Sequence, residues 1–119
     1  MNLQSPEYVG GHGLLNGKAV LVTAAAGAGI GFSAATRAAE EGARVVVISD
    51  IHEGRLDAAV EKLKSDTGLT EVFGRIANVA SEEDVRALID FAEQATGGVD
   101  ILINNAGLGT SKLLIEMED

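Results

Sequence analysis

The sequence predicts an α/β fold in which helices cover both faces of a doubly wound parallel sheet. Four short runs of aliphatic and β-branched residues alternate with three longer segments whose apolar residues recur at helical spacing. Apolar runs without polar alternation are typical of strands buried on both faces, as in parallel sheets. The intervening segments are long enough to cross back over a sheet, and right-handed crossovers leave few strand orders. We expect the order 3-2-1-4, with the direction of winding reversing between the first and fourth strands.

The predicted strands are bounded by glycine or polar residues. They cover residues 19–22, 44–48, 72–77 and 99–103. The second run continues into Ser49 and Asp50, and the fourth continues into Asn104-Asn105-Ala106-Gly107. Residues 1–16 contain the only proline and the only tyrosine and show no sustained periodicity, so we expect an N-terminal arm there. The remainder, 17–119, is predicted to form the ordered domain.

Each segment between the strands carries an apolar stripe at helical spacing. The stripe residues are Ala34, Ala35, Ala38 and Ala39 in the first helix, Leu56, Ala59, Val60 and Leu63 in the second, and Val85, Leu88, Ile89 and Ala92 in the third. Gly42 is predicted to end the first helix, and Gly97-Gly98 the third. Ser81 is predicted to cap the third helix, because three acidic residues follow it at the positive helix end.

Composition excludes several classes of function. The chain has 119 residues, with 9 basic and 18 acidic side chains and a formal charge of −9, so neither nucleic acid nor an anionic membrane surface is an expected partner. The absence of cysteine excludes disulfides and thiolate chemistry. No signal peptide and no apolar run long enough to cross a bilayer is visible, so we expect a cytoplasmic protein. His12 and His52 lack a second ligand at metal spacing, so no metal site is expected.

The glycine-rich turn Gly27-Ala28-Gly29-Ile30-Gly31 follows the first predicted strand and opens the first predicted helix. A dinucleotide site needs this arrangement, because glycine lets the backbone approach a pyrophosphate whose charge is met by amides at the helix N-terminus. Strand-to-helix turns also use glycine for structural reasons alone. The context favours the functional interpretation.

Asp50 ends the second predicted strand, 19 residues beyond Gly31. An acidic group at this place reaches the ribose hydroxyls of a bound adenosine. A carboxylate also repels a 2′-phosphate, so NAD is favoured over NADP, although Arg44 and Arg55 are near enough in sequence to receive a phosphate. Methyltransferases bind an adenosine ribose in a similar way, but they usually carry an acidic residue before the glycines, where this chain has Val22-Thr23.

Together, Val22 to Gly31, Asp50 and Asn104-Asn105-Ala106-Gly107 resemble the short-chain dehydrogenase/reductase family. The resemblance covers residues 17–119 and implies a Rossmann-type fold. It implies that Ala28, Gly29, Ile30 and Gly31 face the pyrophosphate of the cofactor and that Asp50 binds the adenine ribose. It also implies that Asn105, Ala106 and Gly107 line the floor beside the cofactor.

The glycine turn departs from the family pattern in two respects. Ala24 stands where the family has its first glycine, and one extra residue precedes Gly29. Ala25, Ala26 or Gly27 would then take the role of the missing glycine, and Ala25 and Gly27 are included among the expected cofactor contacts.

The third predicted strand leads into Asn78-Val79, where the family usually has Asp-Val. In the family that carboxylate accepts a hydrogen bond from the adenine amino group. The resemblance therefore implies that Asn78 and Val79 contact adenine, with the Asn78 amide oxygen as an uncharged acceptor.

The resemblance implies an oxidoreductase that transfers hydride between NAD and a secondary alcohol or ketone. The variant motifs are most similar to actinobacterial reductases that act on acyl-CoA or steroid-derived substrates. Members of the family are expected to form homo-oligomers when complete. The alternative is a catalytically inactive nucleotide-binding or assembly module.

The family's catalytic serine and Tyr-x-x-x-Lys pair do not occur in this sequence. The only tyrosine is Tyr8, which is followed four positions later by His12. The resemblance therefore implies that residues 17–119 are the N-terminal, adenosine-binding half of the domain, truncated after the fourth strand. A fragment, one subunit of a split enzyme and a stand-alone module all fit. In each case the fourth strand is an open sheet edge, so we expect the isolated chain to be poorly stable or to self-associate.

Overall fold

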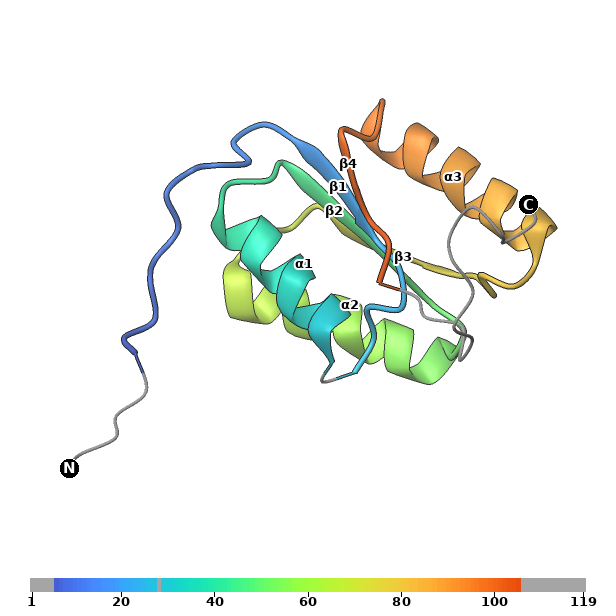
Figure 1. Cartoon of the computed structure of the whole chain (residues 1–119), viewed down its shortest axis with the longest axis horizontal. Coiled ribbons are helices and arrows are strands. Elements are labelled where there is room, and N and C mark those ends of the chain that lie inside the picture. Colours follow the sequence, from blue (N-terminus) through green and yellow to red (C-terminus); the bar gives the residue numbers. More distant parts are fainter. Residues whose placement is uncertain (1–5, 28, 106–119) are drawn as a thin grey trace.

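The computed structural model describes residues 6–27 and 29–105 (Figure 1). The elements are β1 (Ala19–Val22), α1 (Ile30–Glu40), β2 (Val45–Asp50), α2 (Glu53–Thr67), β3 (Val72–Ile76), α3 (Glu82–Thr96) and β4 (Ile101–Ile103). All strand pairs in the four-stranded sheet are parallel, and the strand order is β3-β2-β1-β4. The predicted α/β class and strand order are confirmed.

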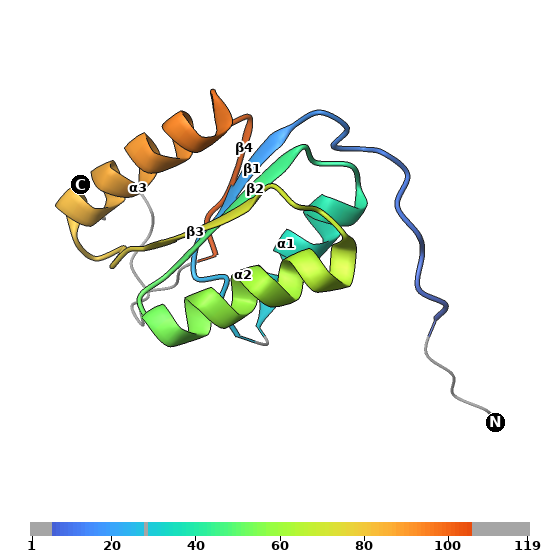
Figure 2. The ribbon, with the colours of Figure 1, turned by 180° about the vertical axis from the view of Figure 1, so that it is seen from behind.

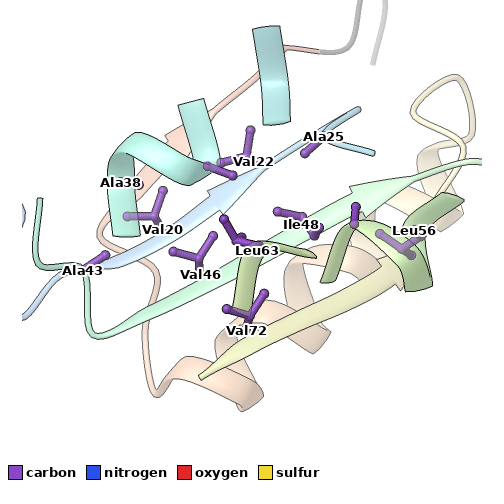
Figure 3. Packing of buried hydrophobic residues seen from close by; sticks show 12 residues of the cluster. Val20, Val22, Ala25, Ala38, Ala43, Val46, Ile48, Leu56, Leu63 and Val72 are labelled. Carbon is purple, nitrogen blue, oxygen red and sulfur yellow. The ribbon is translucent and has the colours of Figure 1, made fainter. Parts of the chain in front are cut away.

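The two central strands are buried on both faces. Helices α1 and α2 cover one face of the sheet and α3 covers the other, as the opposite views of Figures 1 and 2 show. Val20, Val22, Val46 and Ile48 pack beneath α1 and α2 (Figure 3), whereas the alternate residues Leu21 and Val47 pack beneath α3. This alternation is why β1 and β2 read as unbroken apolar runs: successive side chains enter two different cores.

The ends of the helices follow local chemistry. Ser81 caps α3 as predicted, since its hydroxyl accepts a hydrogen bond from Asp84 N–H at 3.2 Å. Gly97 ends α3 in the left-handed conformation at φ 78°, and Gly68 ends α2 in the same way at φ 76°. Helix α1 begins within the glycine-rich turn, with Gly29 as its N-cap.

Strand β4 begins at Ile101, two residues later than predicted. Asp100, just before β4, bonds to β1 partly through its side chain. Its N–H donates to Ala19 O at 2.9 Å, and its carboxylate accepts from Ala19 N–H at 2.8 Å. A side-chain oxygen thus replaces a backbone carbonyl as the acceptor. Strand β2 extends to Asp50, because β3 continues beside it and pairs Ile76 with Asp50.

The segment before β1 is fastened to the C-terminal end of α1. The Glu41 carboxylate accepts from His12 N–H at 2.6 Å and from Leu14 N–H at 3.2 Å, and it pairs with the Arg37 guanidinium at 2.7 Å. Arg37 also donates to Val9 O and Gly10 O. These bonds hold the pKa of the Glu41 carboxyl below its ordinary value, with the His12 N–H as the largest contributor.

None of the helices in the described part of the chain is both long enough and apolar enough to span a membrane.

Candidate functional site

The candidate site lies where the winding of the sheet reverses. Strands β1 and β4 are neighbours, yet α1 after β1 and α3 before β4 lie on opposite faces of the sheet. The loops that leave the carboxyl ends of such strands diverge and form a crevice, which is the usual ligand site of open α/β sheets. Residues 23–29 follow β1, and residues 104–105 follow β4.

The three glycines of the turn differ in what explains them. Gly27 has φ 101°, which favours glycine. Gly31 permits close packing, since a Cβ there would lie 2.6 Å from Asn105 Nδ2 and 2.7 Å from Ala24 O. Gly29 has an ordinary φ of −90°, and no atom of residues 6–27 or 29–105 is found within 4 Å of the position its Cβ would occupy. Neither backbone conformation nor packing within the described part of the chain requires glycine at position 29, whereas close approach of a ligand to the backbone would.

The N-terminus of α1 is open to a ligand within the described residues. Gly29 supplies no side-chain cap, and the first turn contains no acidic residue. The amides of a first helical turn have no partners inside the helix, and they carry the positive end of the helix dipole. Ile30, the first helical residue, is 80% exposed. The arrangement suits an anion that binds several backbone N–H groups at once.

Asp50 lies at the end of β2, next to this loop. Its carboxylate accepts from Ala26 N–H at 3.2 Å through Oδ2 and from His52 N–H at 3.1 Å through Oδ1. Its backbone carbonyl accepts from Ala77 N–H at 3.0 Å. Asp50 is therefore half-buried at the junction of the segments that follow β1, β2 and β3.

A hydrogen-bond network joins the ends of β1 and β4. The Thr23 hydroxyl donates to Asn104 Oδ1 at 3.1 Å and accepts from Asn105 N–H at 3.0 Å. The Asn105 side chain donates from Nδ2 to Ala24 O at 3.1 Å. Thr23 and Asn104 were not among the predicted site residues, although a threonine directly after a buried strand was a signal for such a contact.

The loop after β1 adopts an unusual backbone conformation at Ala24. Ala24 has φ 51°, in the left-handed region that glycine occupies most easily. The alanine that stands in place of the family's first glycine therefore keeps a glycine-like conformation. Ala25, which was expected to contact the cofactor, lies fully buried in the core under α1, and its N–H donates to Ser49 O at 2.9 Å.

Asn78 and Val79 occupy the turn between β3 and α3. The Asn78 side-chain oxygen accepts from Ala80 N–H at 3.0 Å, and Asn78 N–H donates to Asp84 Oδ2 at 2.9 Å. An amide oxygen has a second lone pair, so Asn78 can still accept from a ligand. Val79 and Asn104 help to line a cavity of about 130 Å³ between the sheet and α3.

Three of the predicted contacts, Ala28, Ala106 and Gly107, lie outside the described residues. Among residues 6–27 and 29–105, no group of three or more His, Cys, Asp and Glu side chains is placed to hold a metal ion.

Comparison with known proteins identifies the family. A family model described as short chain dehydrogenase matches residues 18–119. The chain belongs to the short-chain dehydrogenase family, a class of nicotinamide-dependent oxidoreductases, as its motifs predicted. This result decides against the methyltransferase interpretation.

Two curated relatives show the extent of the similarity. The chain is 49% identical over 120 residues to the (5R,7aS)-5-hydroxy-7a-methyl-1-oxo-2,3,5,6,7,7a-hexahydro-1H-indene-carboxyl-CoA reductase of Mycobacterium tuberculosis, covering 100% of this chain and 45% of that protein. It is 42% identical over 98 residues to 7alpha-hydroxysteroid dehydrogenase of Escherichia coli, covering 82% of this chain and 37% of that protein. The chain spans less than half the length of these relatives.

Solved structures of the family match the fold. A short chain dehydrogenase from Mycobacterium smegmatis superposes with a TM-score of 0.83 at 49% identity, covering 97% of this chain and 46% of that one. An L-sorbose reductase from Gluconobacter frateurii complexed with NADPH and L-sorbose gives 0.72 at 34% identity, covering 88% and 39%. A short chain dehydrogenase/reductase from Burkholderia phymatum in complex with NAD gives 0.72 at 36% identity, covering 87% and 36%. The structural neighbours thus include complexes with both cofactors.

Proposed function

We propose that this chain is the part of a short-chain dehydrogenase that binds the adenosine and pyrophosphate of NAD(H). In the whole enzyme, hydride would pass between the nicotinamide and a secondary alcohol or ketone. The observation that carries the proposal concerns Gly29. It opens an uncapped helix at the reversal of the sheet, and neither its conformation nor its contacts with the other described residues require glycine. A pyrophosphate that approaches the backbone there explains both features.

The residue roles follow from this position. The amides at Gly29, Ile30 and Gly31 would face the pyrophosphate, and Asp50 would accept from the hydroxyls of the adenine ribose. Asn78 and Val79 would contact adenine, and Asn105 would hold the floor of the site against Ala24. Gly27 and Ala25 would act indirectly, through the turn and the core. When bound, the nicotinamide supplies the hydride chemistry, and these residues would fix the other end of the cofactor.

We propose NAD in preference to NADP. A 2′-phosphate would be placed against the Asp50 carboxylate, and the two negative charges would repel each other. Arg44, one of the two arginines that could in principle bind a 2′-phosphate, lies far from Asp50. It precedes β2 at the opposite end, about 20 Å along the strand, and its backbone N–H donates to Lys18 O. Arg55 lies in the first turn of α2, on the same side as Asp50.

The substrate proposal rests on the relatives. The names of two relatives specify a CoA thioester and a hydroxysteroid. We propose an acyl-CoA or steroid-derived alcohol or ketone as the substrate class of the whole enzyme, and we propose that the whole enzyme is a homo-oligomer in the cytoplasm. We assign no proton-transfer residue within the 119 residues, because Tyr-x-x-x-Lys does not occur in them.

A second candidate function is a nucleotide-binding or assembly module without catalysis. Such a module would need the same features that the described residues offer, namely the uncapped start of α1 at Gly29 and the Asp50 carboxylate beside the loop after β1. Oxidation of NADH by the whole protein that contains this chain, in the presence of ketone-bearing acyl-CoA or steroid substrates, would support the enzyme. Cofactor binding without turnover of any of them would support the module.

The test of the proposed site is ADP binding to Gly29→Ala, measured by calorimetry. We expect the added methyl group to weaken ADP binding about tenfold or more, because it occupies space that the phosphates need. The free energy of unfolding should change by less than about 1 kcal/mol, since the φ is ordinary and no atom is displaced.

Gly10→Ala is the matched control. Gly10 also has open space around its Cβ position, but it lies in the N-terminal segment beside Arg37. We expect ADP affinity of this variant to equal that of the natural chain. Equal ADP affinity of the Gly29→Ala variant and the natural chain would contradict the proposed site.

A further inference from the structure

The loop between β1 and α1 is attached to β2 by two consecutive hydrogen bonds. Ala25 N–H donates to the backbone carbonyl of Ser49 at 2.9 Å, and Ala26 N–H donates to the side-chain Oδ2 of Asp50 at 3.2 Å. The first bond extends the pairing of β1 with β2 by backbone atoms alone. The second depends on a side chain, so the identity of residue 50 decides whether Ala26 is held.

The Ala26 bond has features of a positioning contact. A hydrogen bond from an N–H group to a carboxylate is stronger than one to a neutral acceptor. Because Asp50 is half-buried, fewer water molecules compete with the Ala26 N–H for its carboxylate. Directly after Ala26, the chain turns at Gly27 with φ 101° and reaches the N-cap of α1 two residues later. Among the described residues of this loop, Ala26 is thus the one that the Asp50 carboxylate holds just before the phosphate-facing part.

The other carboxylate oxygen fixes a second segment. Oδ1 accepts from His52 N–H, and His52 in turn caps α2 through Nδ1, which accepts from Arg55 N–H at 3.4 Å. Each carboxylate oxygen has more than one lone pair. Asp50 can therefore keep both backbone bonds while accepting hydrogen bonds from ribose hydroxyls.

We propose that Asp50 is a positioning residue for the pyrophosphate-facing loop, in addition to the ribose contact on which the proposed function rests. The carboxylate holds Ala26 so that the turn at Gly27 delivers Gly29 and the start of α1 to the phosphates. Loss of Asp50 should consequently weaken binding of the pyrophosphate even when the ligand has no ribose hydroxyl to lose.

The first experiment measures amide hydrogen exchange in the ligand-free full chain. In Asp50→Ala we expect the protection of the Ala26 amide to fall, while the Ala25 amide, which donates to a backbone carbonyl, keeps its protection. Asp57→Ala removes the same charge from an exposed site on α2 and should leave both amides unchanged. Equal protection of Ala26 in the natural chain and in Asp50→Ala would overturn the proposal.

The second experiment separates positioning from ribose recognition. ADP and 2′,3′-dideoxyadenosine diphosphate carry the same base and pyrophosphate, but only ADP has the ribose hydroxyls. We expect Asp50→Ala to weaken ADP binding about tenfold or more and binding of the dideoxy compound about threefold. Asp50→Asn keeps one oxygen acceptor and should restore part of the affinity for the dideoxy compound. Asp57→Ala should bind both ligands as the natural chain does.

The outcomes distinguish the two proposals. If the natural chain binds neither ligand, the proposed function is wrong, and the exchange experiment still decides whether Asp50 holds Ala26. If the natural chain binds both and Asp50→Ala loses affinity only for ADP, the proposed function stands and the positioning role is overturned. A natural chain that binds ADP but not the dideoxy compound would also overturn it, because all recognition would then lie on the ribose hydroxyls.

Discussion

Ala24 is a non-glycine residue in a conformation that favours glycine. A left-handed φ costs a residue with a Cβ about 1–2 kcal/mol, and a glycine at the same position would relieve this strain. Part of that stabilisation is offset, because glycine also gives the unfolded chain more conformational entropy. We therefore expect Ala24→Gly to stabilise the chain by roughly 0.5–1 kcal/mol in urea denaturation. Ala34→Gly, the same substitution inside α1, should destabilise it by about 1 kcal/mol. Equal destabilisation by both substitutions would contradict the role given to φ at Ala24.

The sequence predicts which residues lie at the site, but it does not predict the contacts that they make there. The position of Asp50 at the end of β2 followed from the apolar run before it, because the carboxyl ends of neighbouring parallel strands meet at one edge. Its bond to Ala26 could not be predicted, since the extra residue in the turn leaves the path of the loop undetermined. Gly31 matched a phosphate motif, but its packing against Asn105 brings together residues far apart in the sequence.

Elements whose signals are local were predicted well. Strand β1 and the caps of α3 at Ser81 and Gly97 are confirmed, because a buried run and a cap depend on near neighbours in the sequence. The start of β4 was predicted two residues early. The apolar pattern could not show that Asp100 pairs with Ala19 through its side chain, since that contact depends on the neighbouring strand.

The Thr23 hydroxyl links the residues that follow β1 to those that follow β4. Thr23→Val keeps the shape of the side chain but removes the donor to Asn104 and the acceptor for Asn105. We expect a loss of about 1–3 kcal/mol in the free energy of unfolding, measured in urea, because two partly buried hydrogen bonds are lost, each worth about 0.5–1.5 kcal/mol. Thr36→Val is the control, since the Thr36 hydroxyl bonds only within α1, to Phe32 O. An equally small effect of both substitutions would contradict this assignment.

The N-terminal segment should detach from α1 at acidic pH. The pKa of Glu41 is lowered in the folded chain, so its contribution to stability is complete above its ordinary value of 4.5 and disappears as the pH falls through the lowered value. Protonation of Glu41 removes the negative charge that accepts hydrogen bonds from His12 N–H and Leu14 N–H and that pairs with Arg37. Glu40 is the second carboxylate that faces Arg37. The protection of the His12 and Leu14 amides, measured as the exchange rate relative to an unfolded chain at the same pH, should therefore fall below pH 4.5.

Glu41→Gln serves as the comparison for that titration. This variant should show fast exchange at His12 and Leu14 already at neutral pH, with no further step on acidification. If the two amides keep the same protection in the natural chain and in Glu41→Gln at neutral pH, the carboxylate does not hold the segment.

At the scale of the whole molecule, two large apolar side chains of the described residues are exposed near β4. Leu102 is 53% exposed and Ile89 is 37% exposed, beside the cavity between the sheet and α3. Exposed apolar groups next to the edge strand of a sheet favour association, and β4 is the edge strand of the described sheet. We expect the chain to self-associate at increasing concentration in sedimentation velocity and Leu102→Thr to shift it toward monomer. Leu14→Thr, at a 73% exposed leucine in the N-terminal segment, should have no such effect. A monomeric chain with a cooperative thermal transition would contradict this expectation.

The central claim is that the reversal point of the sheet binds the adenosine half of NAD, with Asp50 at the ribose. Calorimetric titration of the chain with NADH and with NADPH tests it most directly, because the two ligands differ only by the 2′-phosphate. We predict that NADH binds about tenfold more tightly or better, since the phosphate adds negative charge next to the Asp50 carboxylate. Tighter binding of NADPH would contradict the role of Asp50, and binding of neither cofactor would contradict the site itself.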